Sequence, residues 1–488
     1  MASGLVQDAR HWTWHHAVTF ILTFLGYAFF HACRKAFSNI KDTMAKEFTP
    51  TNITNPVYPL NIWQKADMFD TEKNADVFLG ELDTLFLIAY AIGLFVSGIV
   101  GDRINLRYLL SFGMCGSAIM TFLFGYVSAV FDIQNKFYYR CTYFLNGLLQ
   151  STGWPATVAV MGNWFSKSSG GLIFGFWSAN ASVGNIFGSL LVATVLSYGY
   201  EYGILVNSIL LFCGGIMMFI CLIPHPNDVG LPSPVEADDN HPQKHTCTSG
   251  EASSDAALSD QEQPEIIKIK ENKAIGFFEA LLIPGVIPYS LAYACLKLVN
   301  YTFFFWLPVY LSQGLHWNDA LSDKLSNFYD GGSILGGIIA GVITDLMGIR
   351  SPIVVIMLAL STGCLYIYSA FGTSYTANVL LMFLVGFMLG GPANTISTAI
   401  TADLGKHEKI RGSADALATV TGIVDGTGSI GAAIGQYVVP IINKHSSWHM
   451  VFYFLMIMAG ISMLCVIPML VNEVLNRVRT RKYALLEK

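Results

Sequence analysis

Long runs of apolar residues, separated by short polar stretches, occupy most of this chain of 488 residues. Each run holds about 20 residues, which as an α-helix is long enough to cross a hydrocarbon layer about 30 Å thick. A membrane β-barrel would instead alternate polar and apolar positions. The pattern therefore predicts an all-α membrane protein with twelve spanning helices, at residues 16–34, 78–100, 108–131, 138–162, 171–196, 203–224, 286–311, 327–346, 352–371, 376–400, 413–441 and 449–471.

One ten-residue phrase occurs once in each half of the chain. Gly98–Arg107 and Gly341–Arg350 carry Gly, Asp and Arg at equal offsets, and each phrase lies between two apolar runs. A charged turn repeated between hydrophobic segments is typical of a duplicated membrane unit. We therefore expect two pseudo-symmetric six-helix halves, at residues 1–224 and 276–471, joined by a segment at 225–275 and followed by a basic tail at 472–488.

The segment at 225–275 is rich in Pro, Ser, Asp and Glu, so it is predicted to be a disordered acidic linker. Lys and Arg concentrate in the short loops that lie on the same side of the membrane as this linker and the basic tail. By the positive-inside rule, both termini and the linker are expected in the cytosol. The loop at 36–77 then faces the lumen or exterior, and its Asn52-Ile-Thr54 sequon predicts a glycan on Asn52.

Composition agrees with a membrane protein and argues against other classes. Charged residues make up 12% of the chain, against roughly 25% in soluble domains. The nine Cys show no metal-ligand or redox spacing. The sequence has no P-loop, dinucleotide fingerprint, clustered His/Cys motif or nucleophile elbow. We therefore expect the lipid bilayer as surroundings, and no enzyme activity, cofactor, metal or nucleic-acid partner.

Charged residues within the apolar runs are the candidate functional residues, because a charge is costly inside a membrane. Tyr27, His31 and Arg34 follow each other at i, i+4 and i+7 and share one face of the first span. A hydroxyl, an imidazole and a guanidinium on one face would form an anion-binding stripe. The planar guanidinium of Arg can donate two parallel hydrogen bonds to a phosphate group. The alternatives are an Arg34 that snorkels to the interface at the helix end and a His31 that only packs between helices.

Lys297 lies deep in the seventh span, the counterpart of the first span in the second half. Tyr293 and Tyr301 stand one turn on either side of it. Two cations on pseudo-symmetric helices could hold one polyanion near the middle of the membrane, where repeat interfaces place substrates. Further ionisable residues within spans are Glu81, Asp83, Arg140, Asp330, Asp415 and Asp425.

A second group of charged residues is predicted to control the gates. Asp425 lies in a glycine-rich stretch that allows close helix approach, so we assign it to gating or to contact between the halves. The repeated phrases place further charges beside the ends of helices, where ion pairs would latch one gate state. These latch residues are Asp102, Arg103, Arg107, Asp345 and Arg350.

The repeated phrase resembles the loop signature of the major facilitator superfamily, and Asn105 in its first copy is typical of organophosphate:phosphate antiporters. Over essentially its whole length the chain resembles the sugar-phosphate exchangers of solute carrier family 37. This resemblance implies a major facilitator fold and antiport of a phosphorylated solute against inorganic phosphate by alternating access. Besides Arg34-Lys35, the segments that carry the likeness to organophosphate:phosphate antiporters are Gln150–Pro155, Met161–Phe165, Gly170–Ala179 and Val183–Asn185. Those that carry the likeness to family 37 are Phe78–Cys115, Gly285–Pro308 and Ala416–Tyr437.

The resemblance also assigns site residues. It places the phosphate-binding Arg of the family at Arg34 and the aromatic hydroxyl two turns earlier at Tyr27. The Arg of span seven in bacterial members falls on Asn300, with Lys297 one turn earlier as its substitute, and a His of span five falls on Ala181. We therefore expect transport of a phosphorylated or phosphonate-like organic anion, with phosphate as the exchanged partner.

Two other functions stay open at this stage. One is a proton-coupled organic-anion transporter, with protons carried by Glu81, Asp83 or Asp425, and the other is a non-transporting membrane receptor or scaffold. An accessory membrane subunit also stays open as a partner. The resemblance implies an endomembrane location in the endoplasmic reticulum, and Tyr483–Leu486 has the form of a lysosomal sorting signal.

Overall fold

The computed structural model describes residues 13–49, 68–101, 104–165, 173, 176–231, 277–404 and 415–486. Within these residues the chain forms helices and no strand. The first half consists of α2 (Trp14–Glu47), α3 (Glu72–Gly101), α4 (Leu106–Phe122), η2 (Leu123–Val127), α5 (Ser128–Val130), α6 (Lys136–Gln150), α7 (Gly153–Trp164), α9 (Asn180–Val195), η3 (Leu196–Tyr198) and α10 (Tyr200–Cys221).

After the short turn η4 (Pro226–Val229), the second half repeats this arrangement. It consists of α12 (Phe277–Leu281), α13 (Val286–Val309), η5 (Tyr310–Gly314), α14 (Asp319–Met347), α15 (Ser351–Phe371), α16 (Tyr375–Asn394), η6 (Thr395–Ile400), α17 (Thr401–Leu404), α18 (Asp415–His445) and α19 (Trp448–Leu486). Among the described residues, ten helices are long and apolar enough to cross a membrane. The remaining two predicted spans correspond to α6 with α7, and to α18.

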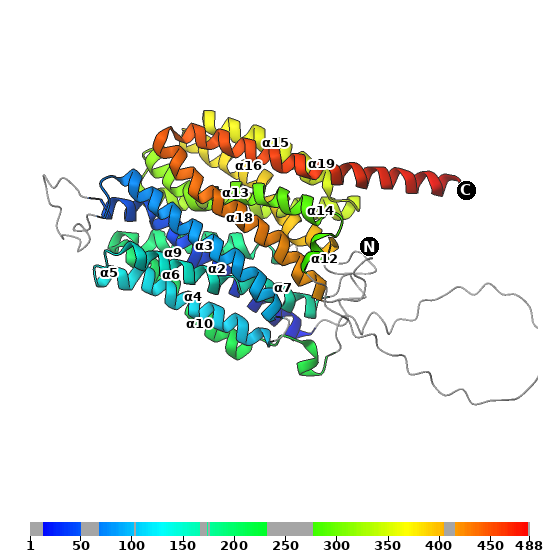
Figure 1. Cartoon of the computed structure of the whole chain (residues 1–488), viewed down its shortest axis with the longest axis horizontal. Helices are drawn as coiled ribbons and strands as arrows, with labels where there is room; N and C mark the ends of the chain where they lie inside the picture. Colours follow the sequence, from blue (N-terminus) through cyan, green and yellow to red (C-terminus); the bar gives the residue numbers. More distant parts are fainter. Residues whose placement is uncertain are drawn as a thin grey trace, which may run out of the picture.

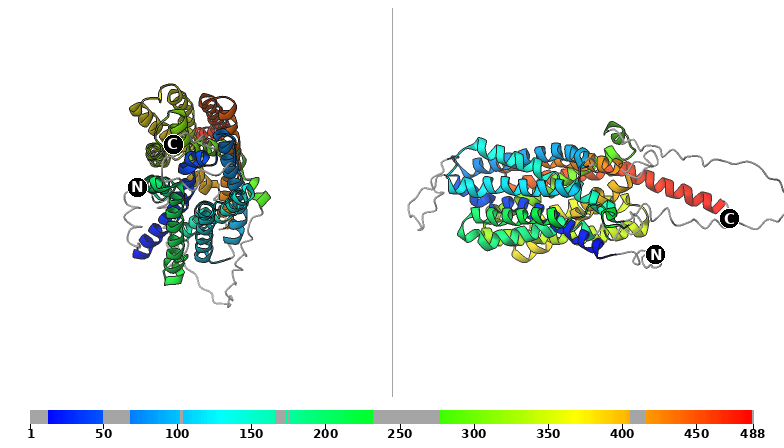
Figure 2. Two further views of the ribbon diagram at one scale, coloured as in Figure 1. Left: turned by 90° about the vertical axis from the view of Figure 1, so that its left-hand side faces the viewer. Right: turned by 90° about the horizontal axis from the view of Figure 1, so that it is seen from below.

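The two halves lie side by side, with α4 and α10 at the bottom of Figure 1 and α15, α16 and α19 at the top. The interface between them is formed by α2, α3 and α9 of the first half against α13, α14 and α18 of the second. The start of α2 and the end of α19 lie at the same end of the bundle, which we call the terminal end (Figures 1 and 2). The last part of α19 extends beyond the bundle there, and the opposite end is called the distal end.

Close backbone approach holds the halves together along α3 and α18. A methyl group added at Gly80 would lie 2.7 Å from the carbonyl oxygen of Gln436, closer than Cβ atoms are found. The hydroxyl of Thr84, one turn further on, donates to the carbonyl of Ala433 at 3.2 Å. Glycine is therefore required at position 80 for this packing.

The first helix is longer than the sequence predicts. It does not end at Arg34 but continues to Glu47, because the polar residues that follow find partners inside the protein. Lys35, Ser38 and Lys41 are buried and donate to backbone carbonyls of the second half. Arg34 therefore lies within a helix at the interface of the halves, 2% exposed, and does not snorkel at a helix end.

Several predicted features fall outside the described residues. These are the sequon at Asn52, the latch residues Asp102 and Arg103, and most of the predicted linker at 225–275. Their assignments stay predictions, as do the boundaries of the two halves.

Candidate anion-binding site between the halves

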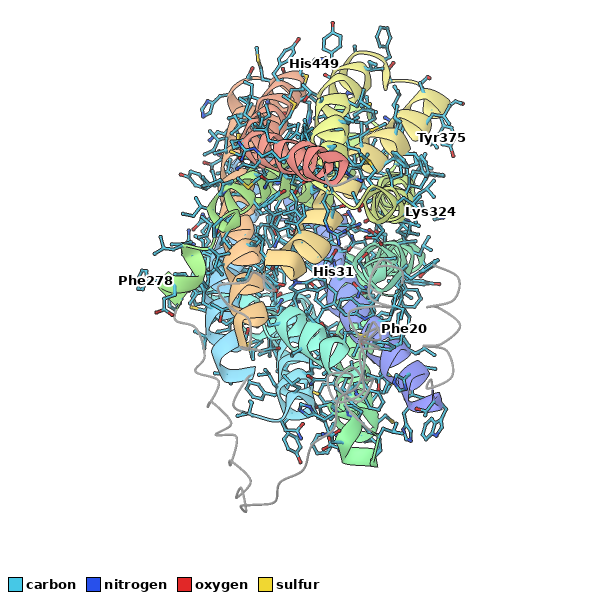
Figure 3. All side chains as sticks on the ribbon, turned by 90° about the vertical axis from the view of Figure 1, so that its right-hand side faces the viewer. Phe20, His31, Phe278, Lys324, Tyr375 and His449 are labelled. Atoms are coloured by element: carbon cyan, nitrogen blue, oxygen red, sulfur yellow. The ribbon has the colours of Figure 1, made fainter. Side chains whose placement is uncertain are left out.

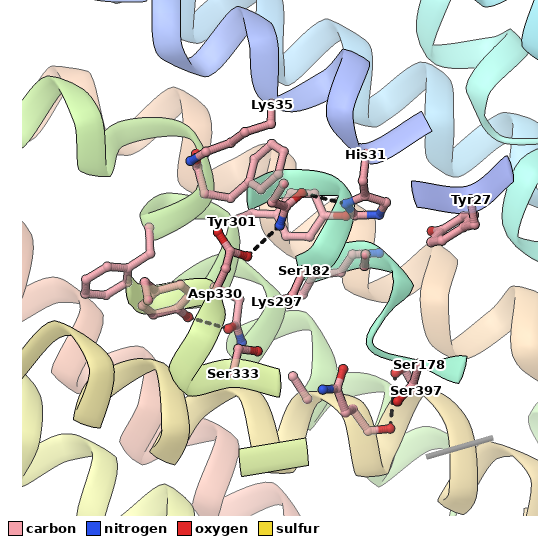
Figure 4. A pocket seen from close by; sticks show the side chains of 18 of the residues that line it. Tyr27, His31, Lys35, Ser178, Ser182, Lys297, Tyr301, Asp330, Ser333 and Ser397 are labelled. Carbon is pink, nitrogen blue, oxygen red and sulfur yellow. Dashed lines mark hydrogen bonds between the residues drawn. The ribbon is translucent and has the colours of Figure 1, made fainter. Parts of the chain in front are cut away.

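A cavity lies between the two halves and is lined by both of them (Figure 4). His31, one of its residues, lies near the centre of the molecule when it is viewed from the terminal end (Figure 3). The polar and aromatic lining residues are Tyr27, His31, Lys35, Trp154, Ser178, Ser182, Asn185, Tyr293, Lys297, Asn300, Tyr301, Ser326, Tyr329, Asp330, Ser333, Asn394, Ser397, Thr398 and Asp425. The structure therefore brings six of the seven predicted substrate residues to one cavity.

Arg34, the seventh, lies behind the cavity wall. Its Nε donates to Oε1 of Gln150 at 3.1 Å, and its Nη1 donates to the Tyr301 hydroxyl, from the other half, at 3.0 Å. The guanidinium also lies over the ring of Tyr90, 4.7 Å from the ring centre. Its Nη2 is buried without a hydrogen-bond partner among the described residues, and no carboxylate of these residues pairs with it. A buried cation with an unused donor is costly unless an anion binds it.

Lys297, in contrast, is neutralised within its own half. Its Nζ lies 2.7 Å from Oδ1 of Asp425 and 2.9 Å from Oγ of Ser429. The ion pair joins α13 to α18, and both side chains are nearly buried. In this structure Asp425 thus bonds to a cavity residue of its own half, and its predicted role in gating or in contact between the halves stays a prediction.

Lys35 is a cavity residue that our sequence-based site did not include. Its Nζ donates to the carbonyl of Phe304 at 2.6 Å, and Ser38 donates to the same oxygen at 2.7 Å. This carbonyl lacks its usual helical donor, because four residues later stands Pro308, which has no N–H. The proline in α13 therefore creates the acceptor that holds the first half against the second.

A chain of hydrogen bonds also crosses the cavity wall from α2 through α9 to α14. Nδ1 of His31 lies 3.0 Å from Oδ1 of Asn185, and the amide nitrogen of Asn185 donates to Oδ1 of Asp330 at 2.7 Å (Figure 4). Because Oδ1 of Asn185 can only accept, Nδ1 of His31 is the donor in this chain. His31 therefore contacts the other half through Asn185.

Aromatic residues and amides complete the wall. The ring of Tyr27 packs against Trp154 at 4.8 Å and against His31 at 4.9 Å. The indole nitrogen of Trp154 is a buried donor without a partner among the described residues. Across the cavity, the hydroxyl of Tyr329 donates to Oδ1 of Asn300 at 2.5 Å. The wall thus includes one buried donor, the Trp154 indole N–H, that an oxyanion could use.

Polar residues of both halves close the distal end of the interface. The side-chain nitrogen of Gln313 donates to Asp42 at 2.8 Å and to Asp76 at 3.2 Å, and Lys46 lies 3.4 Å from Asp319. We call these five residues the distal seal. Burial and the nearby carboxylate of Asp42 raise the pKa of Asp319, which lies at the start of α14 before its apolar part.

The predicted latch residues that the structure describes make contacts within their own halves. Arg350 lies 3.3 Å from Asp345, its neighbour in the repeated phrase. Arg107 donates through Nε to the carbonyl of Leu222. Each repeated phrase therefore joins helices of one half in this structure.

The comparisons with known proteins agree with this architecture. The sequence profile of the Major Facilitator Superfamily matches residues 23–421. Sugar phosphate exchanger 3 of Gallus gallus is 49% identical, over 99% of this chain and 97% of the relative, and its Homo sapiens counterpart is 48% identical, over 97% and 96%. The chain belongs to solute carrier family 37 of the major facilitator superfamily. Another member, the glucose-6-phosphate exchanger SLC37A2 of Mus musculus, is 37% identical over 95% of this chain and 93% of its own.

Solved structures share the fold. A bacterial homolog of the human lysosomal transporter Spinster aligns with a TM-score of 0.62 at 14% identity, covering 93% of this chain and 97% of its own. A D-xylose–proton symporter aligns with a TM-score of 0.61 at 13% identity, covering 92% and 96%. The predicted all-α major facilitator fold and the family resemblance are thereby confirmed. This member of family 37 is a multi-pass membrane transport protein and not an enzyme.

Proposed function

We propose that this protein moves a phosphorylated or phosphonate-like organic anion across a membrane in exchange for inorganic phosphate. The observation that carries the proposal is Arg34, a buried guanidinium at the interface of the halves with an unused donor and no carboxylate partner among the described residues. The relatives named sugar phosphate exchanger 3 and glucose-6-phosphate exchanger support this class of substrate.

Arg34 and Tyr301 together suggest how the anion binds. In the structure the Tyr301 hydroxyl accepts a hydrogen bond from Nη1 of Arg34 and also forms part of the cavity wall. A phosphate group that replaced this hydroxyl would gain Nη1 and Nη2 as a two-pronged donor. Tyr301 belongs to the second half, so anion binding would exchange one contact between the halves for another.

The position of the cavity relative to the distal seal supports a cycle of alternating access. The seal residues join the halves at one end of the interface, beyond the cavity. In the proposed cycle the halves rock about the bound anion, which breaks the seal and closes the terminal end. The bound anion neutralises Arg34, and this lowers the cost of keeping its charge buried in the closed intermediate.

Exchange in phosphate-loaded proteoliposomes tests the proposal, with external labelled phosphate and glucose 6-phosphate as probes. One charge-assisted hydrogen bond contributes about 1.5–3 kcal/mol, so Arg34→Ala should lower exchange by roughly 10- to 100-fold. Arg140→Gln is the matched control, because Arg140 is 40% exposed and pairs with Glu81 away from the cavity. Equal rates in wild type and Arg34→Ala would contradict the proposed site.

The coupling ion and the location belong to the same proposal. We place the protein in the endoplasmic reticulum, from the family resemblance, or in the lysosome, from the motif at Tyr483–Leu486. The charge pattern of the loops supports cytosolic termini. Uptake driven by a pH gradient with no phosphate inside would favour the proton-coupled alternative. Tight partner binding without any flux would favour a receptor or scaffold, and co-purification of a membrane protein would reveal an accessory subunit.

A further inference from the structure

Asp330 is a buried carboxylate that lines the cavity and that the exchange mechanism above does not use. It lies on α14 and is 5% exposed. Its Oδ1 accepts a hydrogen bond from Asn185, and Ser182 lies beside the same carboxylate (Figure 4). Both partners belong to α9 of the other half, so the carboxylate is at the interface that must open during transport.

No cation forms an ion pair with Asp330 among the described residues. The nearest candidate is Lys35 on α2, whose charge acts on Asp330 but whose ammonium is bonded to the Phe304 carbonyl. The other carboxylate of the cavity, Asp425, has an ammonium at 2.7 Å. The two acids of the cavity therefore differ: one is paired, and the other is held only by neutral donors.

The unpaired state of Asp330 affects the charge balance of the cavity when a phosphate binds. Lys35 and Lys297 line the cavity with Asp330 and Asp425, and Arg34 lies behind Tyr301. Three cations and two carboxylates leave one net positive charge. A phosphate dianion carries up to two negative charges at neutral pH, so one of them stays uncompensated. Inside a low-dielectric cavity this uncompensated negative charge is costly, and it would lie in the same cavity as the unpaired carboxylate of Asp330.

We propose that Asp330 takes up a proton when a phosphate dianion enters the cavity, so that each dianion is accompanied by one proton. The step converts the Asp330 carboxylate and one solvent proton into a neutral carboxyl group, with no other bond made or broken. The net charge of the site then rises to two and balances the dianion. This inference rests on the proposed function and adds proton coupling to it.

Other titratable groups near Asp330 are less suited to this step. Protonation of Asp425 would break its ion pair with Lys297. A positive charge on His31 would lie on the helix face that carries Lys35 and Arg34, where like charges repel. Asp323, two turns before Asp330 on α14, is buried outside the cavity lining. The α16 and η6 residues of the wall, such as Asn394 and Ser397, carry no titratable side chain.

Calorimetric titration of the purified full-length protein with inorganic phosphate tests the inference. Measurements at one pH in buffers of different ionisation enthalpy count the protons taken up per bound anion. The wild type should take up about one proton more than Asp330→Asn, and the titration of phosphate itself cancels in this difference. Asp228→Asn is the matched control, because it removes an exposed carboxylate that lies outside the cavity lining. It should behave as the wild type.

An infrared difference spectrum provides a second readout that does not require the asparagine variant to fold. Phosphate should produce a protonated-carboxyl band in the wild type, and Asp330→Glu should shift this band. Equal proton counts in wild type and Asp330→Asn, or a band that Asp330→Glu leaves unchanged, would overturn the inference. A wild type that binds neither phosphate nor glucose 6-phosphate would overturn the proposed function itself, and the inference with it.

Discussion

The ion pair between Lys297 and Asp425 makes a quantitative prediction. The two side chains are 4% and 9% exposed and their charged atoms lie 2.7 Å apart, so each charge is desolvated and depends on the other. Removing one partner of such a pair leaves an uncompensated buried charge, at a cost of about 3–5 kcal/mol. Lys297→Met leaves the Asp425 carboxylate buried without a compensating charge, so this variant should be strongly destabilised.

The double variant Lys297→Met/Asp425→Asn separates this cost from a simple loss of contacts. With both charges removed, most of the stability should return, because replacing a buried pair by neutral groups is often close to neutral. The assay is the thermal unfolding midpoint of the purified protein in detergent. Lys297→Met should lower the midpoint on the order of 10 °C, and the double variant by much less. If the double variant lowered the midpoint by the sum of the two single-variant decreases, the pairing of Lys297 with Asp425 would be refuted.

Three further predictions concern the seal and the surface. Pro308→Ala restores the N–H that the Phe304 carbonyl lacks, so it should weaken the hydrogen bond from Lys35 to this carbonyl and loosen the distal seal. The buried Ser322, replaced by Cys, should then react faster with a membrane-impermeant thiol reagent. An unchanged labelling rate would contradict this prediction. The raised pKa of Asp319 means that the closed seal favours its neutral form, so stability of the closed seal should be lost as pH rises through that pKa. Asp319→Asn should reduce the pH dependence of this labelling rate, once the rate is corrected for the thiolate fraction of the cysteine, which itself rises with pH. Asn52→Gln should abolish an enzyme-sensitive mobility shift on gels, and a persisting shift would place any glycan elsewhere.

The fold was largely predictable, because twelve apolar runs and one repeated charged phrase depend only on local sequence. The error in the first span has a clear physical cause. A run of polar residues after Arg34 reads as the end of a membrane helix, but Ser38 and Lys41 are buried against the second half. Their partners are the carbonyls of Phe304 and Phe305 and, for Lys41, also the carboxylate of Asp83. All of these lie far away in the sequence and become visible only in the packed structure.

The site was predictable in part. The face shared by Tyr27, His31 and Arg34 followed from helical spacing, and Lys297 followed from its depth in an apolar run. That Lys297 is neutralised could not be predicted, since it depends on how α13 packs against α18. Trp154 and Asn185 gave no signal as functional residues on their own, because an indole and an amide are ordinary helix-packing groups.

The central claim is that Arg34 binds a phosphate group between the two halves, and equilibrium binding tests it most directly. Purified wild-type protein should bind labelled inorganic phosphate at one saturable site, and unlabelled glucose 6-phosphate should compete. Arg34→Gln, which keeps a side chain of similar polarity but no charge, should weaken binding by roughly 10- to 100-fold. Arg140→Gln should leave the affinity unchanged. Equal phosphate affinity in wild type and Arg34→Gln would contradict the account.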